Sequence, residues 1–409
     1  MTTKTGGTAR FALLLGALTA LGPLANDTYL PSLPQIADDL NASASATQLS
    51  LTACLVGLGS GQMIAGPVSD RLGRRGPLMA GLMLFTLAGL ACSYAPNIWV
   101  LVALRLLQGI GGATGIVIAS AIVRDRHEGA AAARLFSTLM LVTGLAPILA
   151  PVAGGQILRA TDWRGIFLGL AAAGAAIWLA CLTALPETHE AAARQRAKDN
   201  ATQGAFRTLL GDRLYVGYML ACGFAFAAMF AYIAGSPFVL QEIHGMSPQG
   251  FSYVFGVNAL GLVIAAQVGG RIVHKTSPRR LLGIGVTGSA LGGLGTLACA
   301  LTHAPLAPLL VALFVIVTSV GLVLPNSMAL AMDNHGEIAG AAAALIGFLM
   351  HIIGAAMVPL VGLAGKTSAL PMGITAAALG VLAVFSFTVI ARPGGAVSRL
   401  EPVPAEAVR

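Results

Sequence analysis

Three side chains that could hold or transfer a proton lie inside long apolar stretches of this sequence. Asp27 is the only acidic residue in such a stretch, Arg105 is the only arginine or lysine, and His351 is the only histidine near the middle of one. Ionisable groups are costly in hydrocarbon, so they usually face an interior cavity and serve a function. We expect proton coupling at Asp27 and Arg105, whereas His351 could equally be a neutral histidine bonded to a neighbouring helix.

The two charged residues are expected at similar depth. At 1.5 Å per residue, Asp27 lies ~25 Å along a helix that begins near residue 10, and Arg105 lies ~10 Å along one that begins near residue 98. An Asp–Arg pair, direct or through water, is then reasonable if both helices face one cavity. Burial favours the neutral acid and the arginine favours the carboxylate, so Asp27 could exchange a proton for a substrate. The alternatives are a water-exposed Asp27 at the outer end of its helix, a helix break at Asn26 and Asp27 before Pro31 and Pro34, and an Arg105 that bonds backbone carbonyls of the first helix.

The composition excludes most other kinds of site. The chain has 409 residues, 56% hydrophobic and only 10% charged, against roughly 25% charge in soluble domains. The net charge of +8 is better explained by loops held against an anionic membrane leaflet than by nucleic acid. The five cysteines all fall in apolar runs without metal-ligand spacing, so no metal is expected. Because no nucleophile, base and orienting group are clustered, we expect neither an enzyme nor a cofactor.

The apolar runs predict an all-α membrane protein with twelve transmembrane helices. A polar stretch over 187–213 is expected to be a cytoplasmic linker between two six-helix bundles, 1–186 and 214–409, the second with a short cytoplasmic tail. Twenty of the 24 lysines and arginines then fall on one side, which places both termini in the cytoplasm. The spans are expected at 10–30, 46–67, 77–95, 98–121, 135–158, 164–185, 214–238, 250–271, 281–302, 305–329, 339–365 and 369–391.

A short charged stretch, 66–75, separates the second and third of these runs. Gly66 and Gly73 would let the backbone turn sharply there. Asp70 is expected beside the start of the next helix, where the helix dipole favours a carboxylate. The alternative is a generic basic loop on the cytoplasmic side. The stretch also contains Arg71, Arg74 and Arg75.

The pattern G-x-x-x-D-R-x-G-R-R in this stretch resembles the loop between helices 2 and 3 of the major facilitator superfamily. The resemblance implies a cytoplasmic gate and two halves built from inverted three-helix repeats. A basic loop over 269–280 occupies the equivalent place in the second half but lacks the aspartate. The stretch 26–34, N-D-T-Y-L-P-S-L-P, resembles the end of helix 1 in the drug:proton antiporter branch, particularly the bicyclomycin/chloramphenicol-resistance (Bcr/CflA) subfamily.

Two further motifs support that branch. Arg105, Gln108 and Gly109 resemble the superfamily's helix 4 motif, whose arginine is linked to proton transfer. The fifth run resembles the antiporter motif, although alanines replace two of its usual glycines; the alternative is simple packing of small residues. The matching positions of the antiporter motif are Pro147, Pro151, Gly154 and Gly155.

Polar and aromatic residues near these motifs are expected to line a substrate cavity. In the second half, 232–238 and 324–326 are expected to interrupt their helices, which is typical of a binding site. Asn258 and Gln267 are further polar candidates, and the aromatic residues of 224–232 could line the cavity or face lipid. The expected cavity residues are Asn26, Tyr29, Gln108, Tyr232, Ser236, Asn326 and His351.

The resemblance implies a proton-coupled antiporter that exports small amphipathic drugs, of the chloramphenicol/florfenicol or bicyclomycin type, across the inner membrane by alternating access. The alternative is a proton-coupled exporter of a sugar or amino-acid metabolite. The implied partners are the drug, protons and membrane lipid, with the chain acting as a monomer and not binding nucleic acid. A receptor or scaffold that transports nothing would explain neither the motifs nor Asp27.

Overall fold

The computed structural model describes residues 5–127, 129–188, 205–333, 335, 338–363, 365 and 367–392. The described residues form helices and contain no β-strand, and twelve helices are long and apolar enough to cross a membrane. The predicted all-α membrane fold is therefore confirmed. The division into two bundles with a linker stays a prediction, since much of 187–213 falls outside the described residues.

The membrane-length helices come in two groups of six. The first group comprises α1 (Thr5–Asp27), α3 (Ala44–Leu72), α4 (Arg75–Cys92), α5 (Ile98–Arg126), α6 (Gly129–Ala160) and α7 (Trp163–Ala184). The second comprises α10 (Arg213–Phe238), α11 (Pro248–Thr276), α12 (Pro278–Leu301), α13 (Leu306–Met332), α14 (Ala339–Val361) and α15 (Leu370–Phe385). Shorter elements are η1 (Leu30–Ser32), α2 (Leu33–Asp39), α9 (Ala205–Gly211) and the single π-helical turns η2 (Val239–Ile243) and η4 (Ser386–Ile390).

Small residues bring α3 and α5 into backbone contact. A Cβ at Gly57 would overlap the Leu106 carbonyl oxygen, and one at Gly109 would overlap that of Cys54. Helices in lipid have no hydrophobic driving force to associate, so close van der Waals packing of this kind helps to hold them together. Since Arg105 lies one turn before Gly109, the same contact holds the Arg105 backbone against α3.

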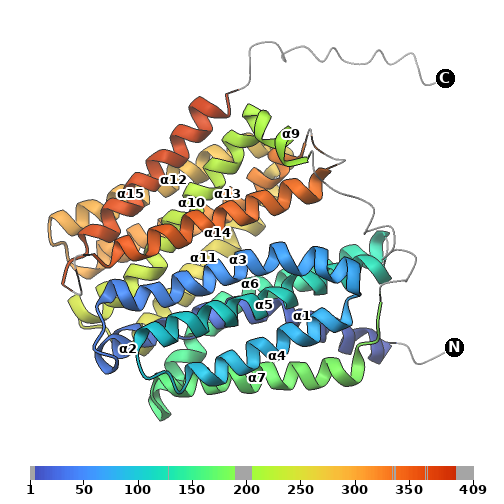
Figure 1. The fold of residues 1–409 in the computed structure, drawn as a ribbon. Helices are drawn as coiled ribbons and strands as arrows, with labels where there is room; N and C mark the ends of the chain where they lie inside the picture. Colours follow the sequence, from blue (N-terminus) through green and yellow to red (C-terminus); the bar gives the residue numbers. More distant parts are fainter. Residues whose placement is uncertain are drawn as a thin grey trace, which may run out of the picture.

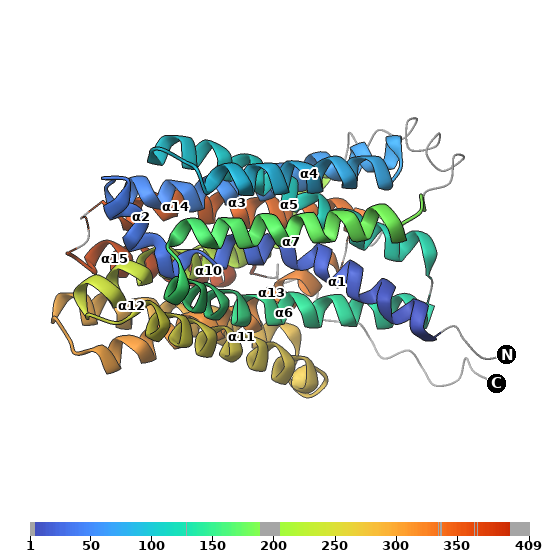
Figure 2. The same cartoon turned by 90° about the horizontal axis from the view of Figure 1, so that it is seen from below.

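The two groups of helices approach each other near α2 and diverge toward the end where α9 lies (Figure 1). Helix α1 begins at that same end, opposite α2 (Figure 2). At the α2 end, Gln48 donates a hydrogen bond to the Ala234 carbonyl at 2.9 Å. Thr52 donates to the Ala355 carbonyl at 3.0 Å. Similar bonds join Ser45 to Pro359, Gln241 to Pro31 and Gln249 to Gly155. The α2 end is therefore the closed end.

The expected helix interruptions in the second half are wrong. The stretch 232–238 belongs to the continuous helix α10, with Pro237 inside it, and 324–326 lies inside α13, with Pro325 inside it. Proline is tolerated in membrane helices because neighbouring groups compensate the backbone hydrogen bond that it removes. In α10 the helical path even continues through the π-helical turn of η2.

Candidate functional site

Asp27 is the last residue of α1 and is 6% exposed. The side-chain amide of Asn26 donates a hydrogen bond to Asp27 Oδ1 at 3.0 Å. The chain then turns through Tyr29 into η1. Helix α6 packs against this turn through Gly154, where a Cβ would overlap the Thr28 carbonyl oxygen. The expected alternative of a water-exposed Asp27 is therefore wrong.

Arg105 lies in a fully buried aromatic and polar box. Its guanidinium carbon is 4.3 Å from the ring centroid of Tyr29 and 5.6 Å from that of Phe167. Its Nη1 donates to Gln108 Oε1 at 2.6 Å. A buried guanidinium over an aromatic face is stabilised by the ring quadrupole, by about 2 kcal/mol when desolvated. Tyr29 also bonds the Ser50 hydroxyl, with the oxygen atoms 3.2 Å apart.

No direct ion pair joins Asp27 to Arg105 in the described part of the chain, which corrects one of the two expected arrangements. The two groups interact electrostatically without touching. Nor does Arg105 bond backbone carbonyls, since its Nε and Nη2 have no hydrogen-bond partner among the described residues. Asn26 Oδ1 and Gln108 Nε2 are likewise buried and unpaired. Buried unpaired polar atoms are rare in proteins, and each one here needs an explanation.

The second group of helices contributes polar atoms from α10 and α11. Asn258 donates to the Tyr232 hydroxyl at 2.9 Å, and the Tyr232 ring stacks on Phe255 with centroids 5.7 Å apart. The Tyr232 hydroxyl lies within electrostatic range of Asp27. Ser236 is buried one turn further along α10. Tyr232 and Asn258 are therefore brought toward the Asp27 site, whereas Gln267 is exposed.

Two expected cavity residues bond their own helices. Asn326 donates to the Leu322 carbonyl at 2.7 Å, and Nδ1 of His351 lies 2.7 Å from the Gly347 carbonyl oxygen. His351 therefore does not bond a neighbouring helix through that atom. Its ring contacts Phe226 of α10, with centroids 5.7 Å apart.

The charged stretch 66–75 is mostly helical, which corrects the expected loop. Helix α3 continues to Leu72, and only Gly73, at φ +97°, and Arg74 connect it to α4. Arg74 pairs with Asp70 of α3 and with Asp125 of α5, the latter at 2.8 Å. Asp70 therefore caps no helix start; it joins Arg74 to the end of α3.

A carboxylate does occupy the start of α4, but it belongs to Glu187. Its two oxygens accept the backbone N–H groups of Arg74 at 2.8 Å and Arg75 at 3.2 Å. A helix start favours an anion because its first N–H groups lack partners. Sequence analysis missed this contact, since Glu187 lies more than a hundred residues away and reads as linker. Arg71 is exposed, and the Arg75 side chain bonds the Leu182 carbonyl.

The antiporter-motif residues lie in the second half of α6, and Gly154 and Gly155 are the ones near its closed end. Pro147 and Pro151 lie inside the continuous helix. Gly154 contacts the end of α1, as described above. The Gly155 carbonyl accepts the 2.9 Å hydrogen bond from Gln249 of α11. The motif therefore connects the Asp27 turn to the second group of helices. The alternative, simple packing of small residues, accounts for the close contact at Gly154 but not for the hydrogen bond from Gln249.

Twelve membrane-length helices around a buried acid and arginine define a multi-pass membrane transporter, not an enzyme. The chain belongs to the Major Facilitator Superfamily, which residues 15–359 match. It is 43% identical to the uncharacterized MFS-type transporter YdgK of Bacillus subtilis, over 92% of this chain and 95% of that one. It is 30% identical to a bicyclomycin resistance protein homolog of Haemophilus influenzae, with the same coverage.

A third relative, the multidrug resistance protein MdtL of Escherichia coli K12, is 31% identical over 61% of this chain and 63% of that one. These relatives confirm the assignment to the drug:proton antiporter branch, Bcr/CflA-like. Solved structures agree on the fold: a D-xylose-proton symporter has a TM-score of 0.76 at 17% identity, covering 95% of this chain and 98% of its own. A bacterial Spinster homolog in an inward-facing conformation has a TM-score of 0.75 at 13% identity, covering 94% and 96%.

Proposed function

We propose that this protein is a proton-coupled antiporter that exports small amphipathic drugs, of the chloramphenicol/florfenicol or bicyclomycin type, across the inner membrane. The observation that carries the proposal is a buried Asp27 near an Arg105 that does not pair with it. A carboxyl in this position can change its charge without first breaking an ion pair. The resistance proteins among the relatives support a drug as the substrate.

The transport cycle follows from this arrangement. A proton that enters from outside neutralises Asp27 and favours release of the drug, and inward opening releases the proton and loads the next drug. Arg105 stays charged throughout, because Gln108 and the Tyr29 ring hold its guanidinium. Gly154 lets motion of α6 act on the Asp27 turn, since no side chain separates the two backbones.

The orientation follows from the positive charges, which place both termini in the cytoplasm. The closed α2 end then faces outward, so this conformation is inward-facing. The cluster of Asp70, Arg74 and Asp125 lies at the cytoplasmic end, where it belongs to the gate, and the exposed Arg71 remains available to the other bundle. The bundles 1–186 and 214–409 rock about the site as a monomer in lipid.

The side chains near the site favour a neutral or weakly cationic amphiphile. One acid and one arginine offer too few charges for a multiply charged metabolite. Aromatic surface is available on α10, where the rings of Phe226 and Phe230 lie 4.9 Å apart and Tyr232 follows half a turn later. Aromatic walls with a few polar groups are typical of sites for drug-sized ligands.

The test compares the wild-type chain with Asp27→Asn and with Asp333→Asn, whose carboxyl is exposed. Cells that express the wild type and Asp333→Asn should tolerate phenicols or bicyclomycin, and Asp27→Asn should abolish this tolerance at equal expression. Purified wild-type protein should release protons on drug addition, and Asp27→Asn should not. Tolerance that survives a protonophore would contradict proton coupling, and an absence of drug tolerance would favour the metabolite exporter.

A further inference from the structure

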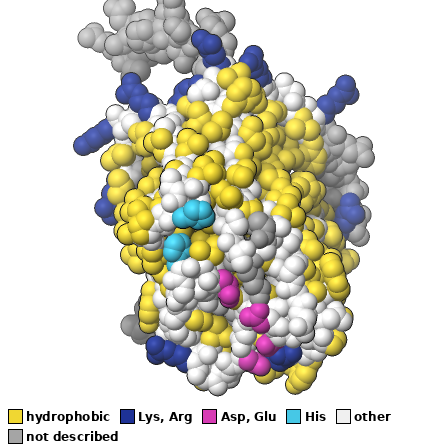
Figure 3. Space-filling model, turned by 90° about the vertical axis from the view of Figure 1, so that its left-hand side faces the viewer, with side chains coloured by type: hydrophobic (Ala, Val, Ile, Leu, Met, Phe, Trp, Pro, Cys, Tyr) yellow, Lys and Arg dark blue, Asp and Glu magenta, His cyan; other side chains and the backbone are white. Residues whose placement is uncertain are grey.

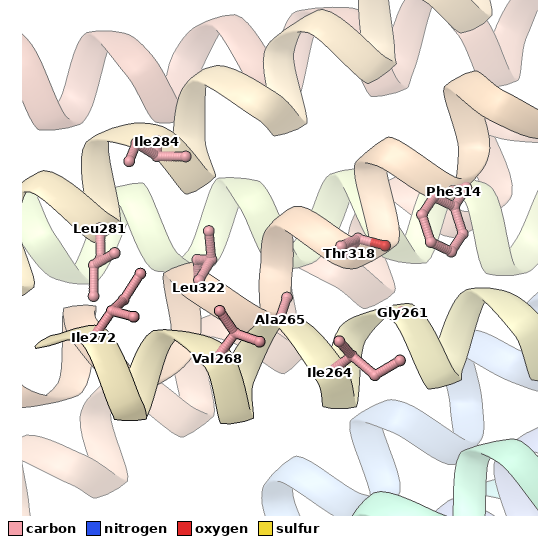
Figure 4. Close-up of a pocket in the computed structure, with 10 residues that line it drawn as sticks. All are labelled: Gly261, Ile264, Ala265, Val268, Ile272, Leu281, Ile284, Phe314, Thr318 and Leu322. Atoms are coloured by element: carbon pink, nitrogen blue, oxygen red, sulfur yellow. The ribbon is translucent and has the colours of Figure 1, made fainter.

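A groove of about 480 Å³ lies between α11 and α12, far along the chain from the Asp27 site (Figure 4). One wall is α11, the other is α12, and α13 forms the floor. Nearly all of its lining is aliphatic or aromatic; the Thr318 hydroxyl is its one polar side-chain group. The side chains that define it are Ile264, Val268 and Ile272 of α11, Ile284 of α12, and Phe314 and Thr318 of α13.

The fold itself creates this groove. Helices α11 and α12 form a hairpin joined at Ser277, which has φ +117°, yet each packs far more against α13 than against the other. Gly261 brings α11 close to α13, because a Cβ there would come within 2.5 Å of Thr318 Oγ1. The two walls are therefore held apart by a common floor, and no side chain of the hairpin fills the space between them.

The groove opens to the outside of the helix bundle. Ile264 is 53% exposed, Val268 46% and Ile284 58%. The face of α11 that packs on α6 is a different one, where Val263 lies against Gly144 and Gly256 lies near Ile148. In a membrane-spanning helix pair, an apolar groove on this side meets acyl chains rather than water. From Gly261 to Ile272 it runs ~16 Å along α11 at 1.5 Å per residue.

One end of the groove is strongly positive. Arg271, Lys275 and Arg280 are exposed beside Ile272 and Leu281, the last lining residues at the hairpin turn. No acidic residue occurs between residues 243 and 332 of the sequence, so no nearby carboxylate of this segment can neutralise them. The fourth basic residue, Arg279, turns inward and bonds the Tyr218 hydroxyl at 2.7 Å. The three exposed cations are therefore available to an anion at the membrane surface.

We propose that the groove binds one acyl chain of an anionic phospholipid, whose phosphate lies against Arg271, Lys275 and Arg280. Basic clusters at the end of membrane helices attract anionic headgroups, by about 1 kcal/mol per charge. A second copy of this chain fits less well, since a two-fold contact through the same surface would bring two positive clusters together. The lipid would brace α11, the helix whose Asn258 bonds Tyr232 near the Asp27 site.

The headgroup contact can be tested by native mass spectrometry of the purified full chain, titrated with phosphatidylglycerol or with phosphatidylcholine of the same acyl chains. The wild type should bind phosphatidylglycerol in preference. Arg271→Gln with Lys275→Gln should weaken that binding about thirtyfold, from the two charges removed. The matched control is Arg124→Gln with Arg126→Gln at the end of α5, which should leave it unchanged. Equal binding of the two lipids by the wild type would overturn the proposal.

The acyl-chain contact has its own variant pair. Val268→Trp should fill the groove and reduce binding of both lipids, whereas Leu291→Trp, at a 63% exposed position of α12 outside the groove, should not. Binding that is unchanged by Val268→Trp would overturn the proposal. A wild-type dimer that Val268→Trp converts to monomer would also overturn it and assign the groove to a second copy. Neither readout depends on drug transport, so the proposal can fail independently of the proposed antiport.

Discussion

The guanidinium of Arg105 shows how one side chain can stay charged inside a helix bundle. It is fully buried, its Nη1 donates a hydrogen bond to a neutral amide, that of Gln108, and its flat face lies over Tyr29. This arrangement stabilises the charge partly through the aromatic ring and leaves two nitrogen atoms, Nε and Nη2, without a partner among the described residues. In the proposed antiport cycle, the drug and a displaced Asp27 carboxylate would accept from those nitrogen atoms at different stages.

Arg105→Lys tests whether shape matters here beyond charge. The ammonium of lysine is a compact, strongly hydrated charge and cannot stack on an aromatic ring while it bonds Gln108. We expect drug efflux to fall at least tenfold at unchanged expression, because about 2 kcal/mol of cation–π contact is lost at the buried site. Arg124→Lys, at an exposed position on the same helix, is the control and should transport normally. Normal efflux by Arg105→Lys would show that a positive charge alone suffices.

At the scale of whole elements, the antiporter motif of α6 is best understood as a contact surface. Gly154 contacts the turn that follows Asp27, and the Gly155 carbonyl accepts a hydrogen bond from Gln249 of α11. Helix α6 therefore contacts the Asp27 turn of the first group and α11 of the second. A shift of α6 would move the Asp27 site and would also change the contact that holds the α2 end closed.

Gly154→Ala should disturb this contact specifically. The added Cβ would overlap the Thr28 carbonyl, a backbone atom that cannot rotate away, and overpacking of this kind costs about 1–3 kcal/mol. We expect a lower unfolding temperature in detergent and reduced efflux. The matched control is Gly144→Ala in the same helix, where a Cβ would meet Val263 at an ordinary 3.6 Å. Equal effects of the two substitutions would refute a special role for position 154.

Sequence patterns located most elements correctly but not the contacts between them. Hydropathy alone singled out Asp27 and Arg105, since a charge within an apolar run is conspicuous. The direct pair was wrong because Tyr29, in the turn after α1, and Phe167 of α7 lie against the guanidinium. The cap at the start of α4 was assigned to Asp70 rather than Glu187, since only the folded chain brings that residue near.

Helix ends and prolines were also hard to place. Helix α3 extends beyond its apolar run, because Arg74 forms an ion pair with Asp70 one turn earlier and donates a hydrogen bond to the Ser69 hydroxyl. Pro237 and Pro325 suggested breaks, yet both helices continue, because a membrane penalises any backbone that leaves its helix. Local composition therefore predicts which segments cross the membrane better than it predicts where regular helix stops.

At the scale of the whole molecule, the balance between the two ends decides which conformation is populated. The described hydrogen bonds that join the two groups of helices lie at the α2 end, where polar side chains of α3 reach carbonyls of α10 and α14. Each such bond contributes about 1 kcal/mol net. A handful of them therefore suffices to bias the equilibrium, and binding energy of similar size can reverse it.

Gln48→Leu with Thr52→Val removes two of these bonds and replaces each polar side chain with an apolar one of similar size. At about 1 kcal/mol per bond, the equilibrium should move roughly thirtyfold toward opening at the α2 end. Spin labels at Tyr94→Cys and Leu301→Cys, exposed positions near that end in the two groups, should report a longer distance. The native cysteines are replaced first. The control is Thr86→Val, because the Thr86 hydroxyl bonds only the Leu82 carbonyl of its own helix among the described residues. This variant should leave the distance unchanged. An unchanged distance in the double variant would show that apolar packing alone holds the α2 end closed.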